Sequence, residues 1–156
     1  MITCTFFGHR NVLVCSPIEI ENAIEALIKE YKDVRFLVGD HGRFDYEVKN
    51  ILVGLKQKYA NIDLVWVLTS VKKYLCLEKE NRNYRYYDYK IYDIELLHYK
   101  KIITFTNKRM VDECDYVICA VDMDKFFSGA VAAVKYAIKK NKKVINLCET
   151  NWIIFI

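Results

Sequence analysis

The chain has 156 residues, of which 53% are hydrophobic and 28% are charged, a balance typical of a soluble globular domain and not of a disordered chain. Its 24 basic and 20 acidic residues leave a net charge of +4, which allows an anionic ligand but makes nucleic-acid binding an unfavoured third hypothesis. No apolar run is long enough to span a membrane, and the opening stretch MITCTFFGHR does not resemble a signal peptide.

The six cysteines stand at positions 4, 15, 76, 114, 119 and 148 and form no Cys-x-x-Cys pair. Most lie inside apolar runs, where a free cysteine behaves as a small hydrophobic residue. This pattern favours reduced, buried thiols in a cytoplasmic protein over a disulfide framework or a zinc site. We therefore expect no metal and no cofactor, and a location in the cytoplasm (that of the host cell if the chain is phage-encoded).

Short apolar runs alternate with helical patterns in the first half of the chain. Runs rich in β-formers span Ile2–Phe7, Val34–Val38 and Ile62–Leu68. A helix is expected to begin at Ser16-Pro17, because serine caps helices well and proline fits their first turn. A second helix is expected over about Phe44–Tyr59.

The second half repeats this alternation. A short helix around Asn107–Glu113 precedes an apolar run at Tyr116–Val121, and a helix at Ala130–Lys140 precedes another run at Val144–Leu147. Strands that are nearly continuously apolar and alternate with helices are typical of a parallel sheet that is covered on both faces. The sequence thus predicts a single α/β domain over residues 1–156, with a Rossmann-like three-layer fold and a mostly parallel sheet of five or more strands.

Two segments depart from the alternation. Lys72–Lys101 carries several tyrosines among charges without a clear period, and we interpret it as an insertion of about 30 residues that forms a lid or an interface. The apolar tail Asn151–Ile156 must be covered, either as an extra strand of its own domain or by a second copy. We expect the second alternative, and hence a homodimer or higher homo-oligomer.

Polar and glycine-rich residues follow the predicted strands. Gly8-His9-Arg10, Gly39-Asp40-His41-Gly42, Thr69-Ser70 and Asp122–Gly129 each come directly after an apolar run. Because the carboxyl ends of parallel strands meet at one edge of a sheet, we expect these segments to line one pocket there.

One wall of this pocket is suited to an anion. Ser128, Gly129 and Ala130 open a helix, where backbone N–H groups and the helix dipole favour a phosphate. Arg10 could bond two phosphate oxygens and His9 a phosphate or ribose hydroxyl. The alternatives are that Ser128 is an ordinary N-cap, Arg10 is solvated and His9 closes the turn.

The segment after the second strand offers a different chemistry. Gly39 and Gly42 allow positive φ and close backbone approach, and Asp40 and His41 are candidates for contacting a base or a ribose. Asp45 falls in the first turn of the next helix. A carboxylate there could hold ribose hydroxyls, but the helix dipole also favours it without any ligand.

Basic and aromatic residues supply further candidates. Lys108 and Arg109 could close over a phosphate from their short helix, or could form a solvated face. The tyrosines of Tyr84–Tyr92 could stack on a base or pack a lid. Met110 and Trp66 are expected in the core.

Several stretches together resemble the SLOG superfamily, and more narrowly its short stand-alone bacterial and phage members. They are TFFGHR, VGDHGRFDYEV, NKRMVDECDYVI, SGAVAAVKYA and KKVINL. The resemblance covers essentially the whole chain. It implies a Rossmann-like domain related to the Lonely Guy phosphoribohydrolases and the DNA-processing protein A domain, which binds nucleotides or nucleotide-derived ligands. Some members sense ADP-ribose-type signals in bacterial immunity and others hydrolyse N-glycosidic bonds.

Two departures from the family pattern bear on activity. Thr106-Asn107 stands where relatives commonly carry Arg-Asn, and the position of the phosphoribohydrolases' catalytic glutamate falls at Val134 or Lys135. The resemblance therefore implies a protein that binds, senses or sequesters a nucleotide-derived signal, in bacterial immunity or in phage counter-defence. The alternative is a nucleotide-processing enzyme of the N-glycoside hydrolase type, with Asp45, Asp40 or Glu113 as its carboxylate.

Overall fold

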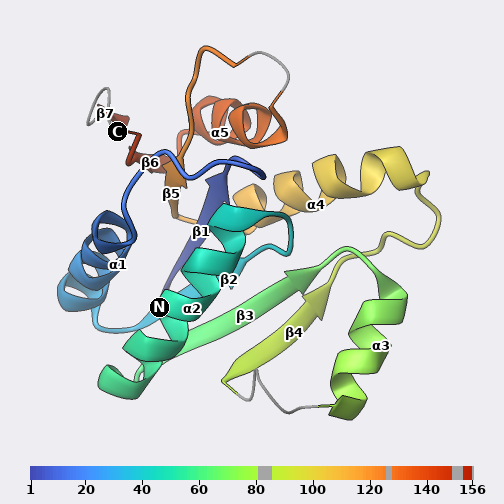
Figure 1. Cartoon of the computed structure of the whole chain (residues 1–156), viewed down its shortest axis with the longest axis horizontal. Helices are drawn as coiled ribbons and strands as arrows, with labels where there is room; N and C mark the ends of the chain where they lie inside the picture. Colours follow the sequence, from blue (N-terminus) through green and yellow to red (C-terminus); the bar gives the residue numbers. More distant parts are fainter. Residues whose placement is uncertain (81–85, 126–127, 149–152, 156) are drawn as a thin grey trace.

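The computed structural model describes residues 1–80, 86–125, 128–148 and 153–155. Strands and helices alternate along nearly the whole of this part of the chain (Figure 1). The strands are β1 (Ile2–Gly8), β2 (Val34–Val38), β3 (Ile62–Leu68), β4 (Tyr87–Ile91), β5 (Tyr116–Ala120), β6 (Lys143–Asn146) and β7 (Ile153–Phe155). The helices are α1 (Pro17–Tyr31), α2 (Arg43–Lys58), α3 (Val71–Glu80), α4 (Tyr99–Glu113) and α5 (Gly129–Lys139).

The strands form one seven-stranded sheet in the order β4-β3-β2-β1-β5-β6-β7. Neighbours from β4 to β6 pair in parallel, and β7 pairs antiparallel to β6. The chain moves outward from β1 to β4 and then returns through α4 to place β5 on the other side of β1. The order therefore reverses between β1 and β5, where open α/β sheets bind their ligands.

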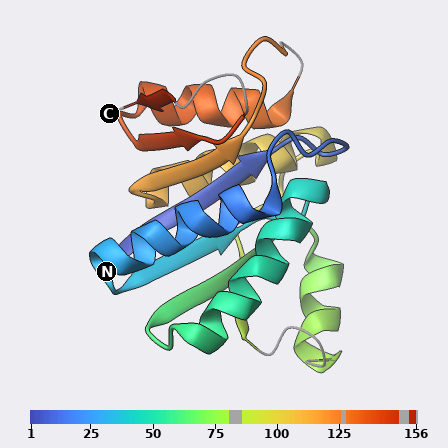
Figure 2. The same ribbon diagram turned by 60° about the vertical axis from the view of Figure 1, so that its left-hand side comes forward.

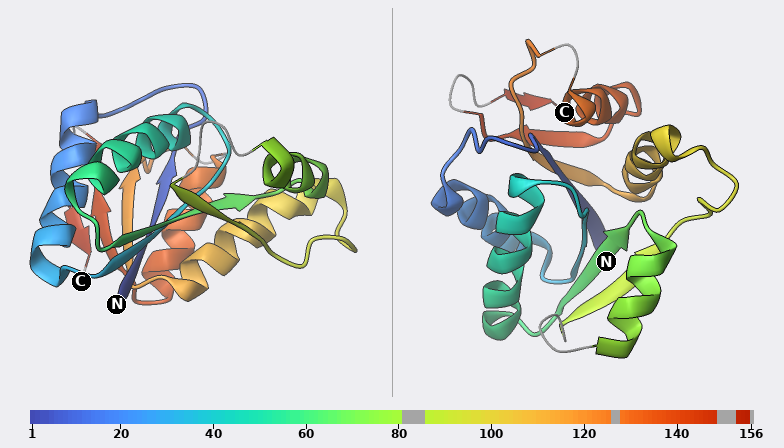
Figure 3. Two further views of the ribbon diagram at one scale, coloured as in Figure 1. Left: turned by 90° about the horizontal axis from the view of Figure 1, so that it is seen from below. Right: turned by 45° about the vertical axis from the view of Figure 1, so that its right-hand side comes forward.

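Helices cover both faces of the sheet, as the predicted three-layer fold requires (Figures 2 and 3). Buried side chains of α1 and α2 pack with one set of strand residues, and Tyr74 and Leu77 place α3 on the same side. Buried side chains of α4 and α5 form a second core with the opposite strand faces. This double burial explains why the inner strands are mostly apolar.

Helix α1 begins as predicted, with Ser16 as its N-cap and Pro17 in its first turn. Ser16 accepts a hydrogen bond from Glu19 N and its own N–H bonds the Glu19 side chain, which completes a capping box ahead of Pro17. The helix expected at Asn107–Glu113 is longer than predicted, because α4 already begins at Tyr99 behind a cap from His98.

The segment Lys72–Lys101 is not the irregular insertion that we expected. It supplies α3 and the parallel edge strand β4, so it continues the alternation of the fold. An edge strand has one neighbour and needs fewer apolar residues, which explains its mixed composition. Tyr87 is buried there, with its ring 6.5 Å from that of Trp66, which lies in the core as predicted.

The tail joins the sheet through β7, whose residues Ile153–Phe155 pair with β6. This is the first of the two alternatives considered for the tail, not the contact between copies that we favoured. Trp152 lies outside the described residues, as does Tyr84 in the other segment. Homo-oligomerisation stays a prediction.

Candidate functional site

A cavity of about 460 Å³ opens at the carboxyl edge of the sheet, at the point where the strand order reverses. Its walls come from the segments after β1, β2, β3 and β5 and from one side of α4. This volume is in the range of small-molecule and cofactor sites.

The N-terminus of α5 forms one wall of the cavity. Ser128 caps the helix, since its Oγ accepts from Val131 N at 3.3 Å and its carbonyl accepts from Ala132 N at 3.1 Å. Within the described residues, the N–H groups of Gly129 and Ala130 have no acceptor. No atom lies within 4 Å of a Cβ built on Gly129, so the approach to these donors is open. Such a helix end favours a bound anion.

His9 fixes the hydroxyl of Ser128. His9 Nε2 accepts a hydrogen bond from the backbone N–H of Asp122 at 2.8 Å, so this nitrogen carries no proton. The proton of the neutral ring is then on Nδ1, which lies 3.1 Å from Ser128 Oγ and donates to it. Burial lowers the pKa of His9, and Lys125 adds to this effect, in agreement with a neutral ring. Because Ser128 Oγ accepts twice, its own O–H remains to donate to a ligand.

Two glycines hold the loop after β1 in place. A Cβ on Gly8 would lie 2.1 Å from Phe44 Cγ, so only glycine allows α2 to pack so closely against the end of β1. Gly42 has φ +97° and caps α2, and a Cβ there would lie 2.5 Å from Arg10 Cα. The carbonyl of Arg10 accepts from Arg43 N at 2.8 Å. These contacts bind the Arg10 segment to the start of α2.

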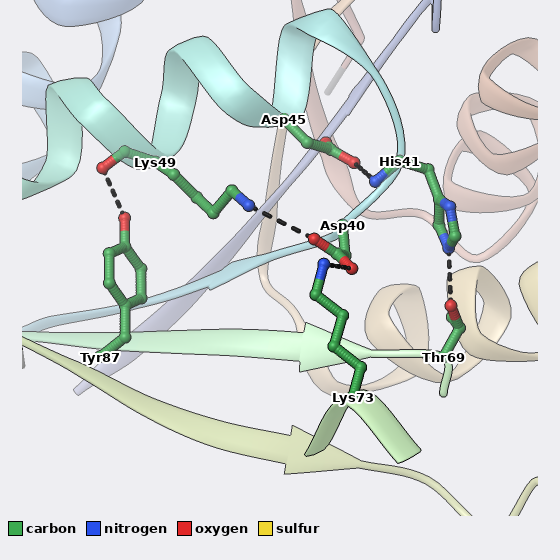
Figure 4. Close-up of polar contacts among 7 residues, drawn as sticks. All are labelled: Asp40, His41, Asp45, Lys49, Thr69, Lys73 and Tyr87. Atoms are coloured by element: carbon green, nitrogen blue, oxygen red, sulfur yellow. Dashed lines mark hydrogen bonds and ion pairs between the residues drawn. The ribbon is translucent and has the colours of Figure 1, made fainter. Parts of the chain in front are cut away.

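The segment after β2 presents a buried carboxyl group to the cavity. Asp45 Oδ2 accepts from the backbone N–H of His41 at 2.8 Å (Figure 4). A Cβ on Gly39 would lie 3.0 Å from that oxygen. His41 Nε2 is hydrogen-bonded to Thr69 Oγ1 at 2.8 Å, which joins the end of β2 to the end of β3. Burial raises the pKa of Asp45 to about 7, against the lowering effects of the His41 N–H and Lys49.

Asp40 lies between two lysines in Figure 4. Its Oδ2 is 2.6 Å from Lys73 Nζ on α3, and its Oδ1 is 3.4 Å from Lys49 Nζ on α2. Lys49 is buried, with Nζ 3.8 Å from the centre of a Trp66 ring. Burial lowers the pKa of Lys49 and Asp40 opposes this change. The Tyr87 hydroxyl donates to the Lys49 carbonyl at 2.7 Å. This cluster braces the β2 loop against α2 and α3.

Helix α4 contributes the opposite wall. Its side chains at the cavity recur at helical spacing and combine two apolar with two polar groups. They are Ile103, Thr106, Asn107 and Met110. Phe7 of β1 and Val67 of β3 line the same cavity. This wall is therefore mainly apolar, with a hydroxyl and an amide side by side.

Ten of the thirteen predicted site residues line this cavity. They are Gly8, His9, Arg10, Gly39, Asp40, His41, Asp45, Ser128, Gly129 and Ala130. Gly42 supports the Arg10 loop instead.

Lys108 and Arg109 are placed elsewhere, which corrects the prediction that they lie at the pocket. They are exposed on the other side of α4, with Lys108 Nζ 5.6 Å from the centre of the Tyr136 ring and Arg109 Cζ 5.2 Å from that of Tyr92. Glu113, one of the three carboxylates considered for an enzyme, is paired with Lys90 at 2.8 Å and does not line the cavity. The described tyrosines of the Tyr84–Tyr92 group do not line it either.

The residues that sequence reasoning did not propose for the site belong to α4 and to the loop edges. They are Asn11, Val12, Thr106, Asn107 and the apolar side chains of the walls, whereas Thr69 and Lys125 lie in segments that were expected at the pocket. A signal existed for Thr106 and Asn107, because they stand where SLOG proteins, which the sequence resembles, commonly carry Arg-Asn. The sequence does not show which side of α4 faces the cavity, so its lining residues could not be identified from the pattern alone.

No group of three or more His, Cys, Asp or Glu side chains suited to hold a metal ion occurs in the described part of the chain. None of the helices within residues 1–80, 86–125 and 128–148 has the length and apolar character needed to cross a membrane. No protein-family model matches the chain, and a search of curated proteins finds no match.

Proposed function

We propose that the protein binds an anionic, nucleotide-derived small molecule in the cavity at the carboxyl edge of the sheet. The observation that carries the proposal is the N-terminus of α5, where two backbone N–H groups and the oriented Ser128 hydroxyl open into the cavity beside Gly129. Lys125, whose charge acts on His9, adds positive charge near this wall, and Arg10 adds positive charge elsewhere in the cavity lining. A phosphate bound there would receive neutral and charged hydrogen bonds together.

The remaining walls suit the other parts of a nucleotide. The carboxyl groups of Asp40 and Asp45 can accept hydrogen bonds from sugar hydroxyls, and the α4 wall offers apolar surface. The resemblance to SLOG proteins supports the same ligand class and a role in sensing or sequestering an immune signal.

The first experiment is isothermal titration calorimetry of the wild type and Gly129→Asp with AMP, ADP-ribose, cyclic ADP-ribose and ribose 5-phosphate. A Cβ fits at Gly129, and aspartate suits the first turn of a helix, so the variant should fold. Its carboxylate occupies the anion position, so binding should be lost. Gly54→Asp is the matched control, because Gly54 on α2 is also open and lies outside the cavity. Absence of binding to the wild type, or equal binding by both variants, would overturn the proposal.

Asp45 favours a second candidate, a nucleotide hydrolase. Its buried carboxyl group lines the cavity and has a pKa raised to about 7, which suits a group that both gives and takes a proton near neutral pH. Mass spectrometry of the same ligands after incubation separates the two functions. An intact ligand recovered after heating supports binding alone. Release of free base by the wild type but not by Asp45→Asn supports hydrolysis.

A further inference from the structure

Thr106 carries a hydroxyl group that the protein itself does not satisfy. The residue is 2% exposed, and its Oγ1 has no hydrogen-bond partner among the described residues. A threonine inside a helix commonly donates to the carbonyl one turn earlier, but Thr106 does not. A buried polar group without a partner destabilises a protein by about 1–3 kcal/mol. The oxygen is covered as it stands, but Thr106 lines the cavity, so a turn of its side chain about χ1 would present the hydroxyl to a bound ligand that can supply the missing partner.

The surroundings of Thr106 indicate which part of a ligand this is. Ile103 and Met110 flank it on α4, and Phe7 and Val67 lie at the same cavity, so the wall around the hydroxyl is apolar. A phosphate would be poorly solvated here and has its own donors at α5. A sugar, polar on most sides, is better matched to the carboxyl groups beside His41.

A nucleobase combines the two properties that this wall requires. Its faces are apolar and its edge alternates hydrogen-bond donors and acceptors. The Thr106 hydroxyl can both donate and accept, and the neighbouring Asn107 amide can do both at once, as an asparagine does on an adenine edge. Asn107 lies next to Thr106 on the cavity side of α4 and is partly exposed.

We infer that the α4 wall is a nucleobase subsite, in which the base packs on the apolar side chains and the Thr106 hydroxyl, assisted by Asn107, bonds its polar edge. This inference rests on the proposed nucleotide binding and makes Thr106 a determinant of specificity. Thr106 stands where SLOG proteins commonly carry an arginine, so in this chain the position would make an uncharged hydrogen bond to the base.

The test compares Thr106→Val, which keeps the shape and removes the hydroxyl, with Thr106→Ser, which keeps the hydroxyl. Calorimetry measures binding of AMP, GMP, CMP and UMP, with ribose 5-phosphate as the probe that lacks a base. For the nucleotide that binds tightest, Thr106→Val should weaken binding about tenfold, the effect of one hydrogen bond. Thr106→Ser should stay near the wild type, and ribose 5-phosphate should bind all three proteins equally.

The stability of the ligand-free variant is a second readout. Thr106→Val removes an unsatisfied hydroxyl from a buried position, so its melting temperature should equal or exceed that of the wild type. Unchanged nucleotide binding by Thr106→Val, or an equal loss for ribose 5-phosphate, would overturn the inference. The wild type could also bind ribose 5-phosphate at least as tightly as every nucleotide. That result would overturn the nucleobase subsite and leave the phosphate site at α5 standing. If the wild type binds none of these compounds and neither ADP-ribose nor cyclic ADP-ribose, the proposed function fails as well.

Discussion

His9 Nδ1 donates to Ser128 Oγ across 3.1 Å and thereby joins the end of β1 to the start of α5, 119 residues apart in sequence. The other ring nitrogen accepts from Asp122 N at 2.8 Å, so one neutral imidazole holds both ends of the loop between β5 and α5. His9 is buried and therefore acts mainly by orienting Ser128.

Replacing His9 by asparagine should destabilise the protein. The shorter side chain cannot accept from Asp122 N and donate to Ser128 together, and loss of such a buried bond costs about 1–3 kcal/mol. Urea unfolding measures this effect. His98→Asn is the matched control, since His98 is exposed and caps α4, a position where asparagine also caps well, so its effect should be small. Equal stability of the two variants would contradict the role given to His9.

The sequence predicts those strands whose burial on both faces requires apolar residues. The expected bounds of Val34–Val38 and Ile62–Leu68 are those of β2 and β3, because both strands have neighbours on either side and helices on both faces. The edge strand Tyr87–Ile91 was missed, since an edge position tolerates the alternating polar residues that obscured its pattern.

The site residues could be predicted where the parallel arrangement of the strands alone determines their position. Residues directly after β1, β2 and β5 meet at one edge in any such sheet, and those predictions placed ten residues at the cavity. Helix α4 is different, because each residue turns the side chain by about 100°. Thr106 and Asn107 face the cavity while Lys108 and Arg109 face outward, and only the packing of α4 decides this.

Removing the carboxylate of Asp40 should be more damaging than removing its exposed partner. Asp40→Asn leaves the buried Lys49 ammonium without the carboxylate that bonds it, and breaking a buried ion pair costs about 3–5 kcal/mol. Lys73 is 43% exposed, so Lys73→Met should cost less than about 1 kcal/mol. Unfolding in urea gives both values. A larger effect of Lys73→Met would show that the Asp40–Lys49 contact is not the brace of this loop.

The two glycines Gly8 and Gly54 should respond to alanine in opposite directions. A methyl group at Gly8 collides with the Phe44 ring, and overpacking of a core costs about 1–3 kcal/mol. A methyl group at Gly54 meets nothing within 4 Å in the middle of α2, where alanine is favoured over glycine by about 1 kcal/mol. Thermal unfolding of both variants tests this. A neutral Gly8→Ala would mean that α2 does not pack on the end of β1 as described.

Asp45 should make stability depend on pH in the direction opposite to an ordinary carboxylate. Burial raises its pKa from 3.8 to about 7, so between these values the folded protein binds more protons than the unfolded chain. The contribution of the protonated group is fully present below the lower value and is lost as the pH rises through the upper one. At higher pH the ion is buried next to Asp40, which adds to the cost, while Lys49 and the His41 N–H reduce it.

Asp45→Asn isolates this contribution, because the amide oxygen can still accept from His41 N and carries no charge. Subtracting wild-type from variant stability removes the titration of all groups common to both proteins, including His9 and His41. As the pH rises between the two pKa values, the unfolding free energy of the variant should increase relative to that of the wild type by at most about 1.4 kcal/mol per pH unit. Above the upper pKa this difference should become constant. Urea unfolding at about pH 5 and about pH 8 measures it. Parallel stability curves would show that the Asp45 carboxyl group ionises in the folded protein as readily as in the unfolded chain, and its assignment as a buried proton donor near neutral pH would fall with that result.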